Sequence, residues 1–279
     1  MKKGKRAVRS CALALALLLC AGGAVSCKKE EKPAVTTPEE EETEVDISGE
    51  ATALFDDATA ALKGGSYHAE ARSYATVRED ASDGAFLGSY LQSFRRDVRG
   101  SDEGETQIIV SAYASGSETP EAVPEGEQTL LYVAYVKDGY CHYDFGEEKR
   151  KEPFLYSYPA RLGLYSLANY KVDGISAIRT DSEAVVTLKY SGSACERSQD
   201  SFVAAMLLAL FGEEIALGYS DMTLKARIDP ETHRMSSYTI RFDALTFGVP
   251  IKRISFTYSE AFSDYGNSEP LNIPDLSDY

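Results

Sequence analysis

The sequence predicts an α+β fold in which helices cover the apolar face of an antiparallel β-sheet. The first observation is a strict alternation of apolar and polar residues over Met222–Asp229, Ser237–Ala244 and Arg253–Ser259. A period of two puts successive side chains on opposite faces, so each segment is a strand with one buried and one solvated face. The second is the short turn Pro230-Glu231-Thr232-His233, which predicts an antiparallel meander. The third is a helical apolar pattern earlier in the chain, which supplies a cover for the sheet.

That helix is predicted to begin after Ser48 as its N-cap and to end at Gly64-Gly65. Its apolar residues recur at steps of three and four and so form one stripe. The stripe consists of Ala51, Leu54, Phe55, Ala58 and Leu62. We expect it to pack on the sheet.

Further strands are predicted between this helix and the meander. They are Tyr67–Arg78, Tyr90–Val98, Thr106–Ala114, Thr129–Val136, Tyr140–Phe145 and Val185–Tyr190. Asp138-Gly139 separates two of them and predicts a tight hairpin. The segment Phe154–Tyr170 is ambiguous, because Pro159 suits the first position of a helix whereas Gly163 weakens a helix.

A second helix is predicted over Gln199–Phe211, with Gly212 as its stop. It is apolar around most of its circumference. At about 13 residues it is too short to span a bilayer. We therefore expect it to be buried against protein or ligand.

The N-terminus predicts export. Residues 1–26 combine basic residues with the apolar run Ala12–Cys20, as a secretory signal does. The segment ends in Ala24-Val25-Ser26-Cys27, which resembles the lipobox of bacterial lipoproteins and implies lipidation of Cys27. Residues 27–46 are acidic and poor in apolar residues, so they predict a disordered tether. Residues 47–279 then form a single domain.

The net charge argues against two classes of partner. The chain has 29 Lys and Arg against 44 Asp and Glu. Removal of residues 1–26 takes away five positive charges and leaves a net charge of −20. Such a balance argues against nucleic acid and anionic lipid headgroups as electrostatic partners.

No catalytic or metal-binding signature is found, so we expect a non-catalytic protein without cofactor or metal. His68, His142 and His233 fall on different predicted elements. Cys141 and His142 are neighbours on a strand, and their side chains therefore point to opposite faces. An oxidising envelope would allow Cys141 and Cys195 to form a disulfide.

The order of elements resembles the LolA-like half-barrel of bacterial lipoproteins. The residues that carry the likeness are Leu62–Ala69 at the passage from helix to strand, Tyr135–Tyr140 at the central hairpin, Ile228–Thr232 at a later hairpin, and Phe262–Gly266 with Leu271–Pro274 at the closing strand. The resemblance implies a curved antiparallel sheet with helices packed on its concave side. By analogy it implies a lipid or another apolar molecule as ligand.

The aromatic content, 18 Tyr and 11 Phe without Trp, suits both β-strands and an apolar concavity. The expected ligand site lies between the second helix and the apolar strand face. It consists of Phe202, Met206, Leu207, Tyr238, Ile240, Phe242, Ile254 and Phe256. The sequence thus predicts a lipoprotein on the outer face of the cytoplasmic membrane, or on the outer membrane of a diderm host. An envelope sensor or protein-interaction module on the same fold is the alternative.

Overall fold

The computed structural model describes residues 44–80, 84–100, 106–117, 128–153, 167, 170–199, 203, 216–247 and 251–279. Residues Glu42–Tyr279 form one compact unit. The lipobox, the tether up to residue 43, and most of the predicted second helix lie outside the described residues.

The described part contains thirteen strands and the helix α1 (Ala51–Gly64). The strands are β1 (Val45–Asp46), β2 (Tyr67–Glu79), β3 (Phe86–Gly100), β4 (Thr106–Ser117), β5 (Thr129–Lys137), β6 (Tyr140–Asp144), β7 (Lys149–Pro153), β8 (Gly174–Arg179), β9 (Ala184–Tyr190), β10 (Leu217–Tyr219), β11 (Met222–Ile228), β12 (Met235–Thr246) and β13 (Lys252–Ser263). Residues 192–199 and Val203 are helical as well.

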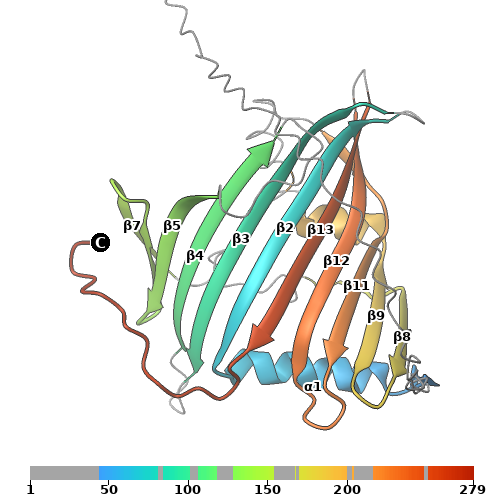
Figure 1. The fold of residues 1–279 in the computed structure, drawn as a ribbon, viewed down its shortest axis with the longest axis horizontal. Helices are drawn as coiled ribbons and strands as arrows, with labels where there is room; N and C mark the ends of the chain where they lie inside the picture. Colours follow the sequence, from blue (N-terminus) through green and yellow to red (C-terminus); the bar gives the residue numbers. More distant parts are fainter. Residues whose placement is uncertain are drawn as a thin grey trace, which may run out of the picture. The chain divides into compact units, whose positions relative to one another are not determined.

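All these strands belong to one curved sheet in which neighbours pair antiparallel (Figure 1). The order is β1-β8-β9-β11-β12-β13-β2-β3-β4-β5-β6-β7. β11 pairs with β12 from Met235 to Arg241, and β10 pairs with its last residues, Ala244–Thr246. β10 and β11 are therefore two halves of one interrupted line beside β12. The predicted large antiparallel sheet is confirmed.

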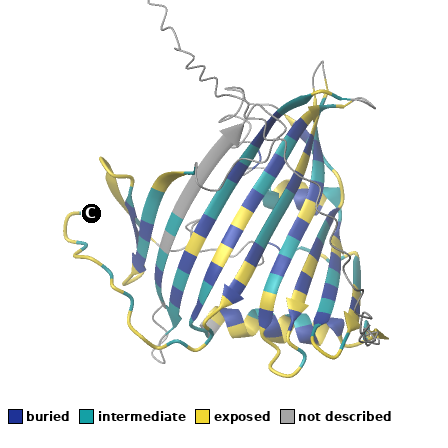
Figure 2. Cartoon of the chain, viewed as in Figure 1, coloured by how far each residue is buried: buried dark blue, intermediate teal, exposed yellow. Residues whose placement is uncertain are grey.

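Alternation along the strands builds the core on one face of this sheet. Figure 2 shows the central strands as alternating bands of buried and exposed residues. The predicted meander is confirmed, because β11, β12 and β13 each bury every second residue over most of their length. Since directly opposed residues of antiparallel strands share a face, Tyr238 on β12, Glu260 on β13 and Ala71 on β2 lie in one row across the sheet.

Helix α1 packs on this face, against β8, β11 and β12. Four members of the predicted stripe are buried, whereas Phe55 is half-buried at the border of the core. The buried members are Ala51, Leu54, Ala58 and Leu62. In the part of the chain that the structure describes, no helix is long and apolar enough to cross a membrane.

Both ends of the sheet are protected against pairing with other chains. β7 has the sequence Lys-Arg-Lys-Glu-Pro, in which charge and a proline without an N–H discourage strand addition. At the other end, β1 is only two residues long. The N–H of Ile47 donates to the carbonyl of Ala177 on β8, and the hydroxyl oxygen of Ser48 accepts from the N–H of Ala177.

The predicted hairpin between β5 and β6 is confirmed. Asp138 and Gly139 both have positive φ, 52° and 75°, as a two-residue turn with the twist of the strands requires.

Several sequence predictions need correction. Ser48 is not the N-cap of α1: that position is Glu50, which makes no side-chain capping bond, and Ser48 Oγ accepts from the N–H of Ala177 instead, at 3.1 Å. The closing strand ends at Ser263, and residues 264–279 contain no strand. β1, β7, β8 and β10 were missed, because they are short and three of them occupy or adjoin sheet edges.

Candidate functional site

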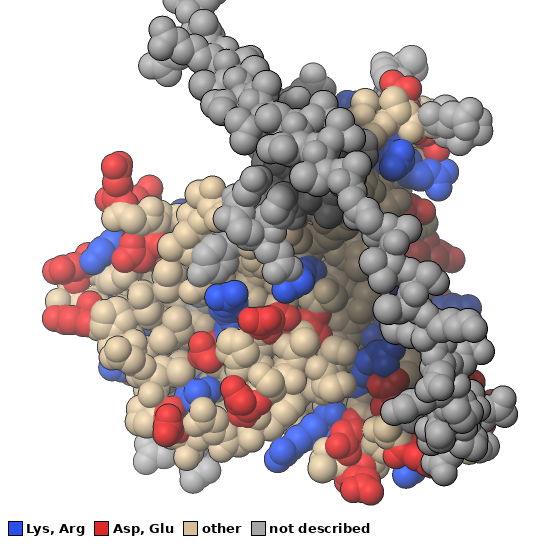
Figure 3. All heavy atoms as spheres, viewed as in Figure 1, with Lys and Arg blue, Asp and Glu red and all other residues tan. Residues whose placement is uncertain are grey.

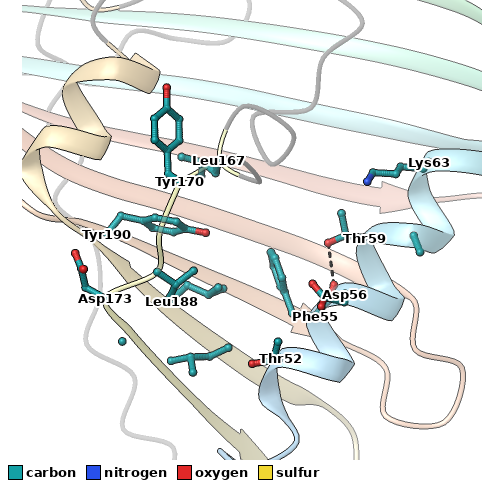
Figure 4. A pocket seen from close by; sticks show the side chains of 14 residues that line it. Thr52, Phe55, Asp56, Thr59, Lys63, Leu167, Tyr170, Asp173, Leu188 and Tyr190 are labelled. Atoms are coloured by element: carbon teal, nitrogen blue, oxygen red, sulfur yellow. Dashed lines mark hydrogen bonds between the residues drawn. The ribbon is translucent and has the colours of Figure 1, made fainter.

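A cavity lies beside α1, and we call it the α1 cavity. Its volume is about 750 Å³, within the range of roughly 300–1,000 Å³ usual for small-molecule sites. Figure 4 shows α1 on one side and the chain that leads into β8 on the other. The lining residues are Thr52, Phe55, Asp56, Thr59, Ala60 and Lys63 of α1, then Leu167, Tyr170, Val172 and Asp173, and finally Gly174, Ile175, Leu188 and Tyr190 of β8 and β9.

The helix wall of the cavity is a second stripe on α1. Its members follow one another at steps of three and four, from Thr52 through Asp56 and Thr59 to Lys63. This stripe adjoins the apolar stripe that packs on the sheet, and Phe55 belongs to both. The hydroxyl of Thr59 donates to the carbonyl of Phe55 at 2.8 Å, so it is satisfied within the helix.

The sheet wall is fixed by backbone pairing. Ile175 on β8 lies opposite Leu188 on β9, so both side chains reach the same face as α1. Tyr190 follows two residues after Leu188 and shares that face. The N–H of Asp173 donates to the carbonyl of Lys189 at 2.8 Å, which ties the start of β8 to β9.

The third wall comes from the chain before β8. The N–H of Tyr170 donates to the carbonyl of Leu167 at 3.0 Å. The guanidinium of Arg197 lies over the Tyr170 ring, 5.9 Å from its centroid. In Figure 4 the hydroxyl of Tyr170 points away from Tyr190 and Phe55.

The cavity has an apolar floor and a polar rim. The floor residues Leu167, Leu188 and Tyr190 are buried, with 1%, 2% and 3% of their surface exposed. The charged rim residues are exposed and are Asp56, Lys63 and Asp173. Such an arrangement can take up an apolar molecule and leave its polar end in water.

Burial raises the pKa of Tyr190 to about 12. Desolvation disfavours the phenolate, so this hydroxyl keeps its proton and remains a hydrogen-bond donor at neutral pH.

Five residues of the sequence-predicted ligand site lie together on the inner face of β12 and β13. They are Tyr238, Ile240, Phe242, Ile254 and Phe256, and all are buried in the core. The rings of Phe242 and Phe256 are 4.7 Å apart. Phe202, Met206 and Leu207 lie outside the described residues. None of the five lines the α1 cavity, and their ligand-binding role stays a prediction.

Sequence reasoning missed most of the α1 cavity. The helix wall can be recognised in the sequence as a polar stripe, Thr52, Asp56, Thr59 and Lys63, beside the apolar stripe of α1. Leu167, Tyr170 and Asp173 come from a segment without clear periodicity, and no local pattern indicates that these three residues line a cavity with α1.

The predicted disulfide is absent from the structure. Cys141 and Cys195 are two buried thiols. Cys141 lies on β6, and Cys195 follows β9, from which seven strands separate β6 in the sheet order. Burial raises the pKa of Cys195 to about 12, so this thiol is a poor nucleophile.

The histidines lie apart, as predicted, and each has its own surroundings. His68 meets Asp97 at 2.9 Å, and His233 meets Asp57 of α1 at 3.1 Å. His142 lies under the ring of Tyr279, with 5.4 Å between the ring centroids. Among the residues described, no group of three or more His, Cys, Asp or Glu is placed to hold a metal ion.

Acidic and basic side chains are interspersed with other residues on the face shown in Figure 3. Oppositely charged side chains also pair locally: Arg253 contacts Asp80 at 2.9 Å, and Arg95 contacts Glu70 at 3.6 Å. The large negative charge of the chain is therefore not expressed as a uniform surface on this face.

No family model and no curated protein matches this chain. Similar solved structures include lipovitellin, from a study of its lipid–protein interactions, with 9% identity, a TM-score of 0.38, and coverage of 77% of this chain and 26% of lipovitellin. A porin mutant of Rh. blastica has 7% identity, a TM-score of 0.21, and coverage of 70% and 99%. The tesB protein of Mycobacterium avium subs paratuberculosis has 12% identity, a TM-score of 0.14, and coverage of 77% and 85%.

The chain thus spans only 26% of the length of lipovitellin. All three TM-scores are below 0.5, so we take no argument about function from these matches. The fold stands as a large, curved antiparallel β-sheet.

Proposed function

We propose that this chain is a lipid-anchored, extracytoplasmic lipoprotein with a LolA-like half-barrel that binds a lipid or another apolar ligand without catalysis. The observation that carries the proposal is the α1 cavity, with its floor of Leu167, Leu188 and Tyr190 below an exposed rim. Moving an apolar chain from water onto such a floor contributes about 0.8 kcal/mol per buried CH₂ group.

The N-terminal sequence supports the anchor. Cys27 follows small residues at the end of an apolar segment, and an acidic tether separates it from the sheet. Two or more acyl chains on such a cysteine suffice for stable attachment to a membrane.

A pair of neighbouring alanines on α1 provides the test. Ala60 lines the cavity and Ala61 does not, and both are exposed on the same helix. In Ala60→Trp the indole occupies the mouth, whereas in Ala61→Trp it lies in solvent. We would measure the binding of Nile red, an uncharged apolar dye, by fluorescence on the full chain carrying Cys27→Ala.

Ala60→Trp is expected to weaken dye binding about tenfold, the equivalent of about two buried CH₂ groups lost. Ala61→Trp should bind as the parent does. Equal binding by all three proteins would contradict the α1 cavity as the site, and no binding by the parent would contradict the proposed function.

The alternative, an envelope sensor or protein-interaction module, is favoured by a different observation. Phe247 and Ile251, which flank the connection between β12 and β13, are 70% and 46% exposed. Exposed apolar side chains mark contact surfaces in some proteins. An intact fold that binds no dye would leave this function as the better one.

A further inference from the structure

The hydroxyl of Tyr190 is the polar group best placed to meet a ligand in the α1 cavity. Tyr190 ends β9 and is 3% exposed, and its position is set by the pairing with Met222 on β11. In Figure 4 its hydroxyl points into the cavity, toward Phe55. Within the described residues it has no hydrogen-bond partner.

Tyr190 as a whole is buried, whereas its hydroxyl opens onto the cavity and is free to meet a ligand there. A hydroxyl that faces an apolar cavity can offer its hydrogen bond to a ligand that enters it. Tyr190 can donate its proton and holds it firmly, because its surroundings are apolar. The complementary ligand atom is therefore a hydrogen-bond acceptor.

The charge of the acceptor follows from the rest of the cavity. Leu167 and Leu188 form the floor beside Tyr190, and an ionised group among them would lose its hydration. Among the described lining residues, Asp56 and Asp173 come from two different walls and outnumber the cation Lys63. Both features disfavour an anion and leave an uncharged oxygen as the acceptor.

We propose that the α1 cavity selects a neutral acyl ester, whose carbonyl oxygen accepts a hydrogen bond from Tyr190 while its chain lies on the floor. The inference rests on the proposed function, since it names the ligand class of the same cavity. A free fatty acid fits less well, because its carboxylate would meet either the apolar floor or the acidic rim.

The test compares three ligands with one chain length: monodecanoylglycerol, decanoate and decane. Each is titrated against Nile red bound to the full chain carrying Cys27→Ala at pH 8, with Tyr190→Phe as the variant. Tyr170→Phe is the matched control, because Tyr170 lines the same cavity but its hydroxyl points away from Tyr190.

Tyr190→Phe is expected to weaken monodecanoylglycerol about fivefold, which is the effect of one neutral hydrogen bond. Decane should displace the dye equally well from the parent and from both variants. Decanoate should compete more weakly than monodecanoylglycerol in the parent. Tyr170→Phe should behave as the parent with all three ligands.

Unchanged monodecanoylglycerol affinity in Tyr190→Phe, or decanoate that competes as strongly as the ester, would overturn this inference. The proposed function would survive either result, provided that decane still displaces the dye. If the parent binds no dye at all, the proposed function and the inference fail together.

Discussion

Arg96 on β3 and Glu260 on β13 form a buried ion pair that reaches across the intervening strand β2. Their side chains are 4% and 0% exposed. On β2, Ala69 lies opposite Arg96 and Ala71 lies opposite Glu260. Only the methyl groups of these two alanines therefore stand between the side chains of Arg96 and Glu260. Larger side chains at these alanines would separate the charges.

Tyrosine hydroxyls complete the surroundings of Glu260. Tyr238 and Tyr258 donate to its Oε2 at 2.7 and 2.9 Å, while Arg96 donates to its Oε1. Burial by itself would lower the pKa of Arg96, but the Glu260 carboxylate and the nearby Tyr258, Tyr238 and Tyr67 together outweigh burial and raise it. The guanidinium therefore stays charged inside the core.

Arg96→Met is predicted to destabilise the fold by about 3–5 kcal/mol, because it leaves Glu260 charged and without its cation. Urea unfolding measures the effect. The double variant Arg96→Met with Glu260→Met should be less destabilised than the single one, since neither charge remains buried.

Arg95→Met provides the control for that experiment. Arg95 is adjacent in sequence, points to the other face, and is 66% exposed beside Glu70. Its loss should change the free energy of unfolding by less than about 1 kcal/mol. An equally mild effect at Arg96 would contradict the role assigned to the buried pair.

Gly192→Ala is predicted to destabilise the fold by about 1–3 kcal/mol through overpacking. A Cβ at this position would lie 2.4 Å from the carbonyl oxygen of Tyr219, a backbone atom that cannot swing aside. Thermal unfolding is the measurement. Gly49→Ala is the matched control, because its Cβ would meet nothing within 4 Å; comparable losses at both positions would speak against the close approach.

Alkaline pH is predicted to destabilise the fold partly through Tyr190. Burial raises its pKa to about 12 in the folded state, against an ordinary value of about 10 in the unfolded chain. The stabilising contribution is thus fully present below pH 10 and is lost as the pH rises from about 10 to 12.

In Tyr190→Phe the loss of stability between about pH 9 and 11 should be smaller than in the parent, by about 1 kcal/mol. Urea unfolding at the two pH values gives this difference. A decline that is identical in the parent and in Tyr190→Phe would show that the phenol is not buried as described.

Membrane attachment is predicted to depend on Cys27. Cys27→Ala should move the protein from the membrane pellet to the soluble fraction and abolish the incorporation of labelled fatty acid, because the acyl chains supply the attachment. Ser26→Ala, which keeps a small residue before the cysteine, is the control and should remain in the pellet. Sedimentation of Cys27→Ala with membranes, together with an unlabelled parent, would rule out the lipid anchor.

The sequence by itself determined the local features of this protein. Alternation over Met222–Asp229 and its neighbours was enough to predict the meander, because side-chain direction in a strand depends only on position. Asp138-Gly139 predicted its hairpin for a similar reason, since the turn needs two residues that tolerate positive φ.

Tertiary structure alone decided the features that join distant segments. Ser48 has the local signature of a helix cap, yet it bonds to Ala177, because the sheet edge brings that N–H within reach. The contact between Arg96 and Glu260 spans 164 residues, and the α1 cavity requires the chain before β8 to lie opposite α1. Such contacts depend on strand order and chain reversal, which the periodicity of single segments does not encode.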